Sequence, residues 1–265
     1  YEEVVDTLDE EDNIRQETQA AYDKVGTTAR LEGGDMKKAH DILTSLNYTS
    51  DEIAFAGVDA VNYQGVGCPH RHADIQPGES ILDMGSGLGV DSLIATEAVG
   101  LQGRVVGVDL SSACVGHAHS RALERGVDNI LSFVQSPIES IGSELDDECF
   151  DAVISNGAFC LLPNKKSGFA ECHRLLKRGG RIAICTTVNK DKLEDGVEFP
   201  LCMQTFARID EIEPMLQELG FVDIHIDFSD SLMVIPEPEQ EAEEHSFDND
   251  DDNEKEEDHP SAVAF

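Results

Sequence analysis

The residues best suited to chemistry follow a short apolar segment, residues 80–84, which contains one carboxylate, Asp83. Three glycines come directly after it, each separated by one residue: Gly85, Gly87 and Gly89. Because glycine has no Cβ, such a turn lets a ligand approach the main chain and exposes N–H groups where the next helix begins. We therefore expect a negative or polar ligand group at this turn.

A second carboxylate, Asp109, ends the next apolar segment, residues 104–108. In a βαβ unit, an acid about 20 residues past the glycines stands at the end of the neighbouring strand and accepts hydrogen bonds from ribose hydroxyls. Val90 stands where the dinucleotide fingerprint has its third glycine, which weakens a nicotinamide or flavin interpretation. The pattern favours a mononucleoside ligand, with a purely structural strand-to-helix turn as the alternative.

The elements that must position these groups have the order of an α/β protein. Hydrophobic periodicity predicts a doubly wound, mostly parallel seven-stranded sheet with ligands at the carboxyl ends of its strands. The predicted strands are residues 80–84, 104–108, 130–134, 150–155, 181–188, 222–228 and 232–235. The main helices after the glycine turn are predicted at residues 111–126, 161–179 and 208–219.

The N-terminal part is predicted to be a helical cap. Residues 12–25 and 36–46 have helical patterns, Asp35 is a candidate cap for the second, and Thr49 begins a short third helix. The glycine-rich loop at residues 61–70 comes next, immediately before the first strand, where an entrance to a ligand site is expected.

Charge is concentrated at the two ends of the 265-residue chain, which has a net charge of −35. Residues 237–258 hold thirteen acidic side chains against one lysine, so we expect a solvated, disordered tail. The acidity argues against nucleic acid or an anionic membrane as partner, and no apolar run approaches membrane length. We divide the chain into a cap with an acidic start (1–70), a ligand-binding domain (71–236) and an acidic tail (237–265), and we expect a small-molecule substrate.

The seven cysteines favour a reduced setting. Their number is odd and no C-x-x-C pair occurs, which fits intracellular thiols better than a disulfide framework or a structural zinc site. They are Cys68, Cys114, Cys149, Cys160, Cys172, Cys185 and Cys202. We predict a cytoplasmic protein without a metal site, with the proviso that a targeting segment removed ahead of Tyr1 would not be visible.

Asp83, the three glycines and Asp109 together resemble the first motif and the ribose-binding acid of class I S-adenosylmethionine-dependent methyltransferases. The resemblance implies a Rossmann-like methyltransferase fold and S-adenosylmethionine as cofactor. It places Ile138 and Glu139 on the adenine side, and Asn156 beside the methionine part and the transferred methyl group. The cofactor-binding residues implied are Tyr63, Asp83, Gly85, Ser86, Gly87, Gly89, Asp91, Asp109, Leu110, Ile138, Glu139 and Asn156.

A narrower resemblance covers roughly residues 45–228 and points to the arsenite methyltransferases. It rests on residues 46–53, on the Gly-x-Gly-Cys loop, on residues 85–91 and on residues 99–110. In that family, thiolates hold a trivalent arsenic atom whose lone pair attacks the sulfonium methyl, as suits a soft, thiophilic centre. The thiols implied are Cys68, Cys202 and, in place of the family cysteine that falls on Gly157, Cys160 if the turn after the fourth strand is reshaped.

Two alternatives stand beside the arsenical one. In the first alternative, the methyl acceptor is a thiol, a selenium compound, a sterol-like or quinone-like ring, or an amine. An oxygen or nitrogen acceptor would need a base, for which His70 and His72 are the candidates. In the second alternative the chain binds the cofactor without turnover and serves as an interaction module through its acidic tail.

Overall fold

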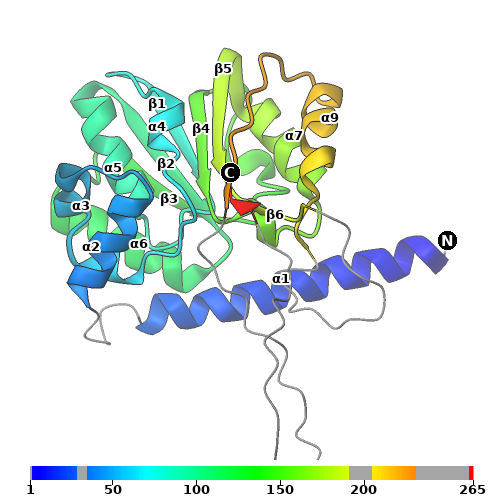
Figure 1. The fold of residues 1–265 in the computed structure, drawn as a ribbon, viewed down its shortest axis with the longest axis horizontal. Coiled ribbons are helices and arrows are strands. Elements are labelled where there is room, and N and C mark those ends of the chain that lie inside the picture. The colour runs from blue at the N-terminus through cyan, green and yellow to red at the C-terminus, as the bar shows by residue number, and fades with distance from the viewer. Residues whose placement is uncertain (1, 29–34, 191–204, 231–262, 265) are drawn as a thin grey trace, which may run out of the picture.

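A five-stranded parallel sheet forms the centre of the computed structural model, which describes residues 2–28, 35–190, 205–230 and 263–264. Its strands are β1 (Ser80–Met84), β2 (Arg104–Asp109), β3 (Leu131–Gln135), β4 (Phe150–Asn156) and β5 (Leu176–Cys185). Their order is β3-β2-β1-β4-β5 (Figure 1). The chain therefore reverses direction across the sheet between β1 and β4, the point where such sheets bind ligands. The Rossmann-like α/β prediction is confirmed.

Helices cover both faces of the sheet, and alternate residues of β1 show which helices cover which face. Ile81 packs in a cluster with residues of α5 (Val90–Val99) and α6 (Ser112–Arg125). Leu82 and Met84 pack on the opposite face with residues of α7 (Lys165–Leu175) and α9 (Ile209–Glu218). Since side chains alternate between the faces of a strand, this arrangement buries β1 on both sides.

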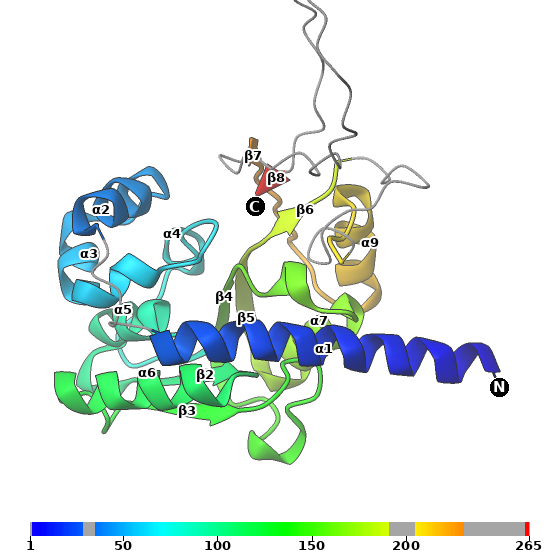
Figure 2. The ribbon, with the colours of Figure 1, turned by 90° about the horizontal axis from the view of Figure 1, so that it is seen from below.

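The N-terminal helices confirm the sequence prediction and extend it. The helix α2 (Met36–Ser45) is capped by Asp35, whose carboxylate accepts from the main-chain N–H groups of residues 37 and 38. Thr49 and Glu52 form a capping box at the start of α3 (Ser50–Ala56). The helix α4 (His70–Ala73) follows the glycine-rich loop. The first helix, α1 (Glu2–Thr28), is longer than predicted and packs along α6 (Figures 1 and 2).

The predicted helix at 161–179 is shorter in the structure. Asn164 caps α7 by accepting from Ser167 N at 3.1 Å, and residues 159–161 ahead of it form a separate 3-10 turn. The helix ends at Leu175 and β5 begins at once, with an irregularity in its pairing to β4 where Gly179 has a φ of 77°. The expected strand at 181–188 is correspondingly split, because β5 ends at Cys185 and β6 (Thr187–Val188) joins another sheet.

The prediction of two further strands in the main sheet is wrong for residues 222–228, which form no strand. Ile224 and Ile226 pack against the core as partly buried side chains. However, Asp223 has a φ of 54°, which interrupts an extended ladder. The predicted strand at 232–235 and most of the predicted acidic tail lie outside the described residues. The main sheet therefore has five described strands rather than seven.

A small antiparallel sheet lies beside the main one. β6 pairs with β8 (Val263–Ala264), which also pairs with β7 (Ser229–Asp230). Among the described helices, none combines the length and apolar character needed to cross a membrane.

Candidate functional site

A pocket opens at the carboxyl ends of β1, β2 and β4, where the sheet order reverses. It is bounded by the glycine turn after β1, by the loops after β2, β3 and β4, by the entrance loop, and by one side of α1. Eleven of the twelve predicted cofactor residues line it: Tyr63, Asp83, Gly85, Ser86, Gly87, Asp91, Asp109, Leu110, Ile138, Glu139 and Asn156. Gly89 does not line it; a Cβ there would meet the Phe133 ring at 2.9 Å, so this glycine serves the packing of α5 on the sheet.

Asp109 fixes the glycine turn to the end of β2. One carboxylate oxygen accepts from Gly87 N at 2.8 Å and the other from Ser111 N at 2.9 Å. Gly87 has a φ of 51°, a conformation that favours glycine, so the turn can present its N–H to this carboxylate. Burial raises the pKa of Asp109, and the main-chain N–H groups oppose the shift. No basic side chain among the described residues bonds to it, and each oxygen keeps a lone pair for a ligand.

The loop after β3 brings Glu139 to one side of the pocket, opposite Arg15 of α1. The Glu139 side chain is 6% exposed, and its Oε1 lies 3.4 Å from Arg15 Nε without a hydrogen bond. Burial raises the pKa of Glu139, while the positive charge of Arg15 lowers it. This carboxylate is therefore a buried acceptor directed at the pocket.

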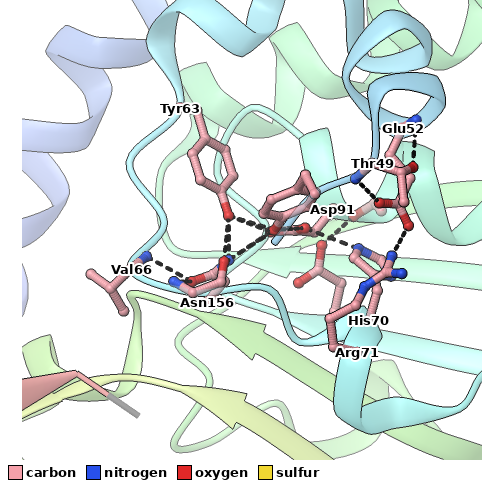
Figure 3. Close-up of polar contacts among 12 residues, drawn as sticks. Thr49, Glu52, Tyr63, Val66, His70, Arg71, Asp91 and Asn156 are labelled. Carbon is pink, nitrogen blue, oxygen red and sulfur yellow. Dashed lines mark hydrogen bonds and ion pairs between the residues drawn. The ribbon is translucent and has the colours of Figure 1, made fainter. Parts of the chain in front are cut away.

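Asp91, in the first turn of α5, is the centre of a polar cluster on another side of the pocket (Figure 3). Its Oδ1 accepts from the Tyr48 hydroxyl at 2.5 Å and lies 2.9 Å from His70 Nε2, and its Oδ2 accepts from Asn156 Nδ2 at 3.2 Å. The Tyr63 hydroxyl lies 3.4 Å from Oδ2. Four side chains from separate elements therefore converge on one carboxylate.

Asn156 ends β4 and holds the entrance loop against the pocket (Figure 3). Its Oδ1 accepts from Val66 N at 2.8 Å and from Gly67 N at 3.2 Å, and its Nδ2 donates to Gly67 O at 2.7 Å. The Asn156 amide also bonds to the Tyr63 hydroxyl. One side chain thereby ties the end of a strand to the loop that precedes the sheet.

Asp83 lies beneath this cluster and is 2% exposed. Its Oδ2 accepts from Ser92 Oγ at 2.5 Å. Burial raises its pKa well above that of a free aspartate, and the nearby Asp91 carboxylate raises it further. Asp83 and Asp91 thus lie on either side of the glycine turn in a shared water-poor region, where a bound cation would favour the ionised form of Asp83.

Three features of the site escaped the sequence prediction. The helix α1 contributes five pocket residues, Arg15, Thr18, Gln19, Tyr22 and Val25. Asp23 of the same helix accepts from Ser111 Oγ at 2.5 Å, which anchors α1 on the start of α6. Arg15 is the first basic residue of an otherwise acidic start, and this isolated cation is a signal that sequence reasoning could have used. Tyr48 and the contact of His70 with Asp91 gave no such signal, because they depend on tertiary proximity.

The two candidate thiols among the described residues belong to different elements. Cys68 is buried among α2, α3 and Tyr63, whereas Cys160 lies in the turn after β4, where its Sγ donates to Gly157 O at 3.2 Å. Neither is among the residues lining the pocket. Burial raises the pKa of both thiols, and Arg71 opposes the shift at Cys68. Cys202 lies outside the described residues.

Two buried polar atoms test whether the pocket fits an adenosine cofactor. Ser86 Oγ has no hydrogen-bond partner among the described residues, Glu139 Oε1 has only the 3.4 Å ion pair with Arg15 Nε, and both residues line the pocket. Buried polar atoms in native proteins are normally satisfied, so such atoms in a pocket wall indicate a polar ligand. Together with Asp109, they fit a ligand that carries amino and hydroxyl donors, as S-adenosylmethionine does.

Comparison with known proteins supports this fit. Residues 75–248 match the family model of the methyltransferase domain. An arsenite methyltransferase of Halobacterium salinarum is 32% identical over 187 residues, which are 68% of this chain and 47% of that protein. An arsenite methyltransferase of Aquipseudomonas alcaligenes is 32% identical over 167 residues, 59% of this chain and 48% of that protein. The chain thus spans about half the length of these curated relatives.

A solved structure shows the same fold. The arsenic(III) S-adenosylmethionine methyltransferase of Chlamydomonas reinhardtii superposes with a TM-score of 0.58 at 24% identity, over 76% of this chain and 67% of that one. The glycine turn, Asp109, the unsatisfied pocket atoms and the matched family model lead to one conclusion: the chain belongs to the S-adenosylmethionine-dependent methyltransferases.

Proposed function

We propose that this protein transfers a methyl group from S-adenosylmethionine to trivalent arsenic, as arsenite or methylarsenite, held by cysteine thiolates. The observation that carries the methyl-transfer part is the pocket at the sheet reversal, where eleven expected cofactor residues meet. The arsenical part rests on the 32% identity to arsenite methyltransferases and on the family pattern around Cys68.

The contacts favour one orientation of the cofactor. Asp109 accepts the ribose hydroxyls, Ile138 and Glu139 face the adenine, and Asp91, Tyr63 and Asn156 surround the methionine end. Two arguments support this orientation: each Asp109 oxygen keeps a lone pair for a ligand, and Asp83 and Asp91 lie close together in the wall, on either side of the glycine turn. A sulfonium and an ammonium group are best stabilised beside those carboxylates.

The chemistry requires little from the protein besides orientation. When bound, S-adenosylmethionine supplies a methyl group on a sulfonium, which leaves as a neutral thioether when the arsenic lone pair forms the new carbon bond. Thiolates such as that of Cys68 hold arsenic by exchange for its hydroxyl groups, and the protons released pass to those hydroxyls as water. Orientation of the lone pair toward the methyl is then the main contribution to rate, and no general base is needed.

The set of thiols differs from the family pattern at Gly157. This residue has a φ of 73°, and a Cβ there would lie 3.1 Å from Gln64 O, so a side chain at this position would strain the turn. Cys160 lies three residues further on, with its thiol bonded to Gly157 O. We propose a site built on Cys68 and Cys202, with Cys160 joining only if the turn rearranges; two thiolates suit a singly methylated arsenical better than arsenite.

We also propose a division of the chain into three parts, a substrate class and a location. Residues 1–70 form the cap, residues 71–236 the cofactor-binding domain and residues 237–265 an acidic tail. The substrate is a small molecule, and nucleic acid and membranes are disfavoured by the negative charge. The abundance of free thiols suits a cytoplasmic location.

The test is turnover by the intact chain with S-adenosylmethionine and, in parallel, arsenite, methylarsenite or small thiols. We expect methylated arsenicals, and we expect Cys68→Ser and Cys202→Ser to lose them while cofactor affinity stays within about twofold. Cys149→Ser is the matched control, since Cys149 precedes the amino end of β4, away from the pocket. Normal arsenical turnover by both test variants would contradict the thiolate site. Cofactor binding without turnover on any acceptor would favour an interaction module.

A further inference from the structure

Tyr48, in the cap, makes three polar contacts through its hydroxyl, yet it does not line the pocket. It lies between α2 and α3 and is 3% exposed. Its hydroxyl donates to Asp91 Oδ1 at 2.5 Å, lies 2.6 Å from the Tyr63 hydroxyl, and accepts from Asn156 Nδ2 at 3.1 Å. Those three partners all line the pocket. One hydroxyl behind the wall therefore contacts three groups in it.

The main chain holds Tyr48 in a fixed position. Tyr48 N donates to Leu43 O at 3.0 Å, at the end of α2 where Asn47 takes a φ of 72°. The capping box of Thr49 starts α3 one residue later. The ring also makes edge-to-face contacts with Tyr63, at 5.5 Å between centroids, and with His70, at 6.1 Å. A side chain held at both ends is suited to orient others.

Proton counting gives the direction of the hydrogen bonds. The Tyr48 hydroxyl has one proton, and the 2.5 Å contact assigns it to the Asp91 carboxylate. Tyr63 is then the donor across the 2.6 Å contact with Tyr48, which is shorter than its contacts with Gly67 O at 3.1 Å and Asp91 Oδ2 at 3.4 Å. Burial strongly raises the pKa of both phenols, so both stay protonated. The resulting chain, Tyr63 to Tyr48 to Asp91, has one polarity.

We propose that Tyr48 is the positioning residue for the methionine end of the cofactor: its hydroxyl fixes Asp91, Tyr63 and Asn156 in the arrangement that receives that end. The proposal rests on the cofactor orientation given above. Without the hydroxyl, Asp91 loses its shortest donor, whereas His70 still contacts Asp91. Tyr63 loses its nearest acceptor and keeps only Gly67 O at 3.1 Å and Asp91 Oδ2 at 3.4 Å. The carboxylate remains in place but is held less firmly.

The test is Tyr48→Phe, which removes the hydroxyl and keeps the ring in its apolar cluster. Calorimetry would compare S-adenosylhomocysteine with methylthioadenosine, which has the same nucleoside but lacks the amino-acid end. We expect the Kd of S-adenosylhomocysteine to rise about tenfold and that of methylthioadenosine to stay within about twofold, as loss of a hydrogen bond to a charged group predicts. Thr96→Val is the control, because Thr96 Oγ1 is also buried on α5 but bonds only to Leu93 O.

A cycle with Asp91→Asn tests the route of the effect. If Tyr48 acts through Asp91, then Tyr48→Phe has little further effect in the Asp91→Asn background. Unchanged affinity of Tyr48→Phe for S-adenosylhomocysteine would overturn the proposal. An equal loss of affinity for S-adenosylhomocysteine and methylthioadenosine would overturn it too, because that result indicates general disruption of the cap. The orientation is tested separately by Asp109→Asn, which should weaken both ligands; failure there would refute the proposed cofactor orientation and with it the role of Tyr48.

Discussion

Gly26 offers the sharpest test of whether α1 closes the cofactor pocket. A Cβ at this helical glycine would lie 2.5 Å from Ala113 C and 2.6 Å from Cys114 N, in the first turn of α6. Both atoms are main chain, so no side-chain rotation relieves the clash and α1 must move. Because Arg15, Thr18, Gln19, Tyr22 and Val25 of the same helix line the pocket, that movement opens the proposed cofactor site.

The magnitude follows from two opposing effects of Gly26→Ala. Alanine favours a helix over glycine by about 1 kcal/mol, whereas overpacking against a fixed backbone costs about 1–3 kcal/mol. We expect little change in the free energy of unfolding of the sheet domain, whose main apolar clusters contain no described residue of α1. The displacement should instead raise the Kd of S-adenosylmethionine by about tenfold, through faster dissociation.

The assay is stopped-flow dissociation of the cofactor together with thermal unfolding, with Gly116→Ala as the matched control. Gly116 also lies in a helix, α6, but a Cβ there would meet nothing within 4 Å. The control should gain up to about 1 kcal/mol of stability and keep the dissociation rate of the parent. Equal cofactor kinetics in Gly26→Ala and the parent chain would refute the role of α1 as part of the pocket wall.

Three further predictions follow from the charged groups. Because the pKa of Asp83 is raised in the folded state, the fold favours its protonated form, and the free energy of unfolding should fall as pH rises above about 4. Urea titrations at a series of pH values should show that Asp83→Asn flattens this decline. Arg15→Gln should weaken cofactor binding by about threefold in calorimetry, because the cation beside Glu139 is lost, and Lys24→Gln further along α1 should not. Burial lowers the pKa of Lys165 to about 8, so the free energy of unfolding of the parent chain, relative to that of Lys165→Met, should rise between about pH 8 and 10. A difference between the two chains that does not change with pH would contradict this.

The sequence predicted those parts of the fold that depend on local pattern. The strands around Asp83 and Asp109, the caps at Asp35 and Thr49, and the end of α6 at Gly126 all follow from hydrophobic period and capping chemistry. The glycine turn and the acid at the end of β2 were enough to predict where a pocket lies, because topology brings the ends of neighbouring parallel strands together.

The failures occurred where distant segments decide the structure. The pattern of residues 222–228 predicted a strand, but strand pairing depends on a partner that local pattern does not specify, and Ile224 and Ile226 pack on the core without joining the sheet. The α1 residues in the pocket depend on how a cap helix docks, which Asp23 and Gly26 set through contacts with α6. Tyr48 was missed for the same reason, because its importance comes from partners far away in sequence.

A crystal structure with S-adenosylhomocysteine is the most direct measurement of the proposed cofactor arrangement. We predict ribose hydroxyls within hydrogen-bond distance of the Asp109 carboxylate, the adenine beside Glu139, and the amino-acid end toward Asp91. A ligand bound outside this pocket, or one lying in the reverse direction with its adenine against Asp91, would contradict the proposed site.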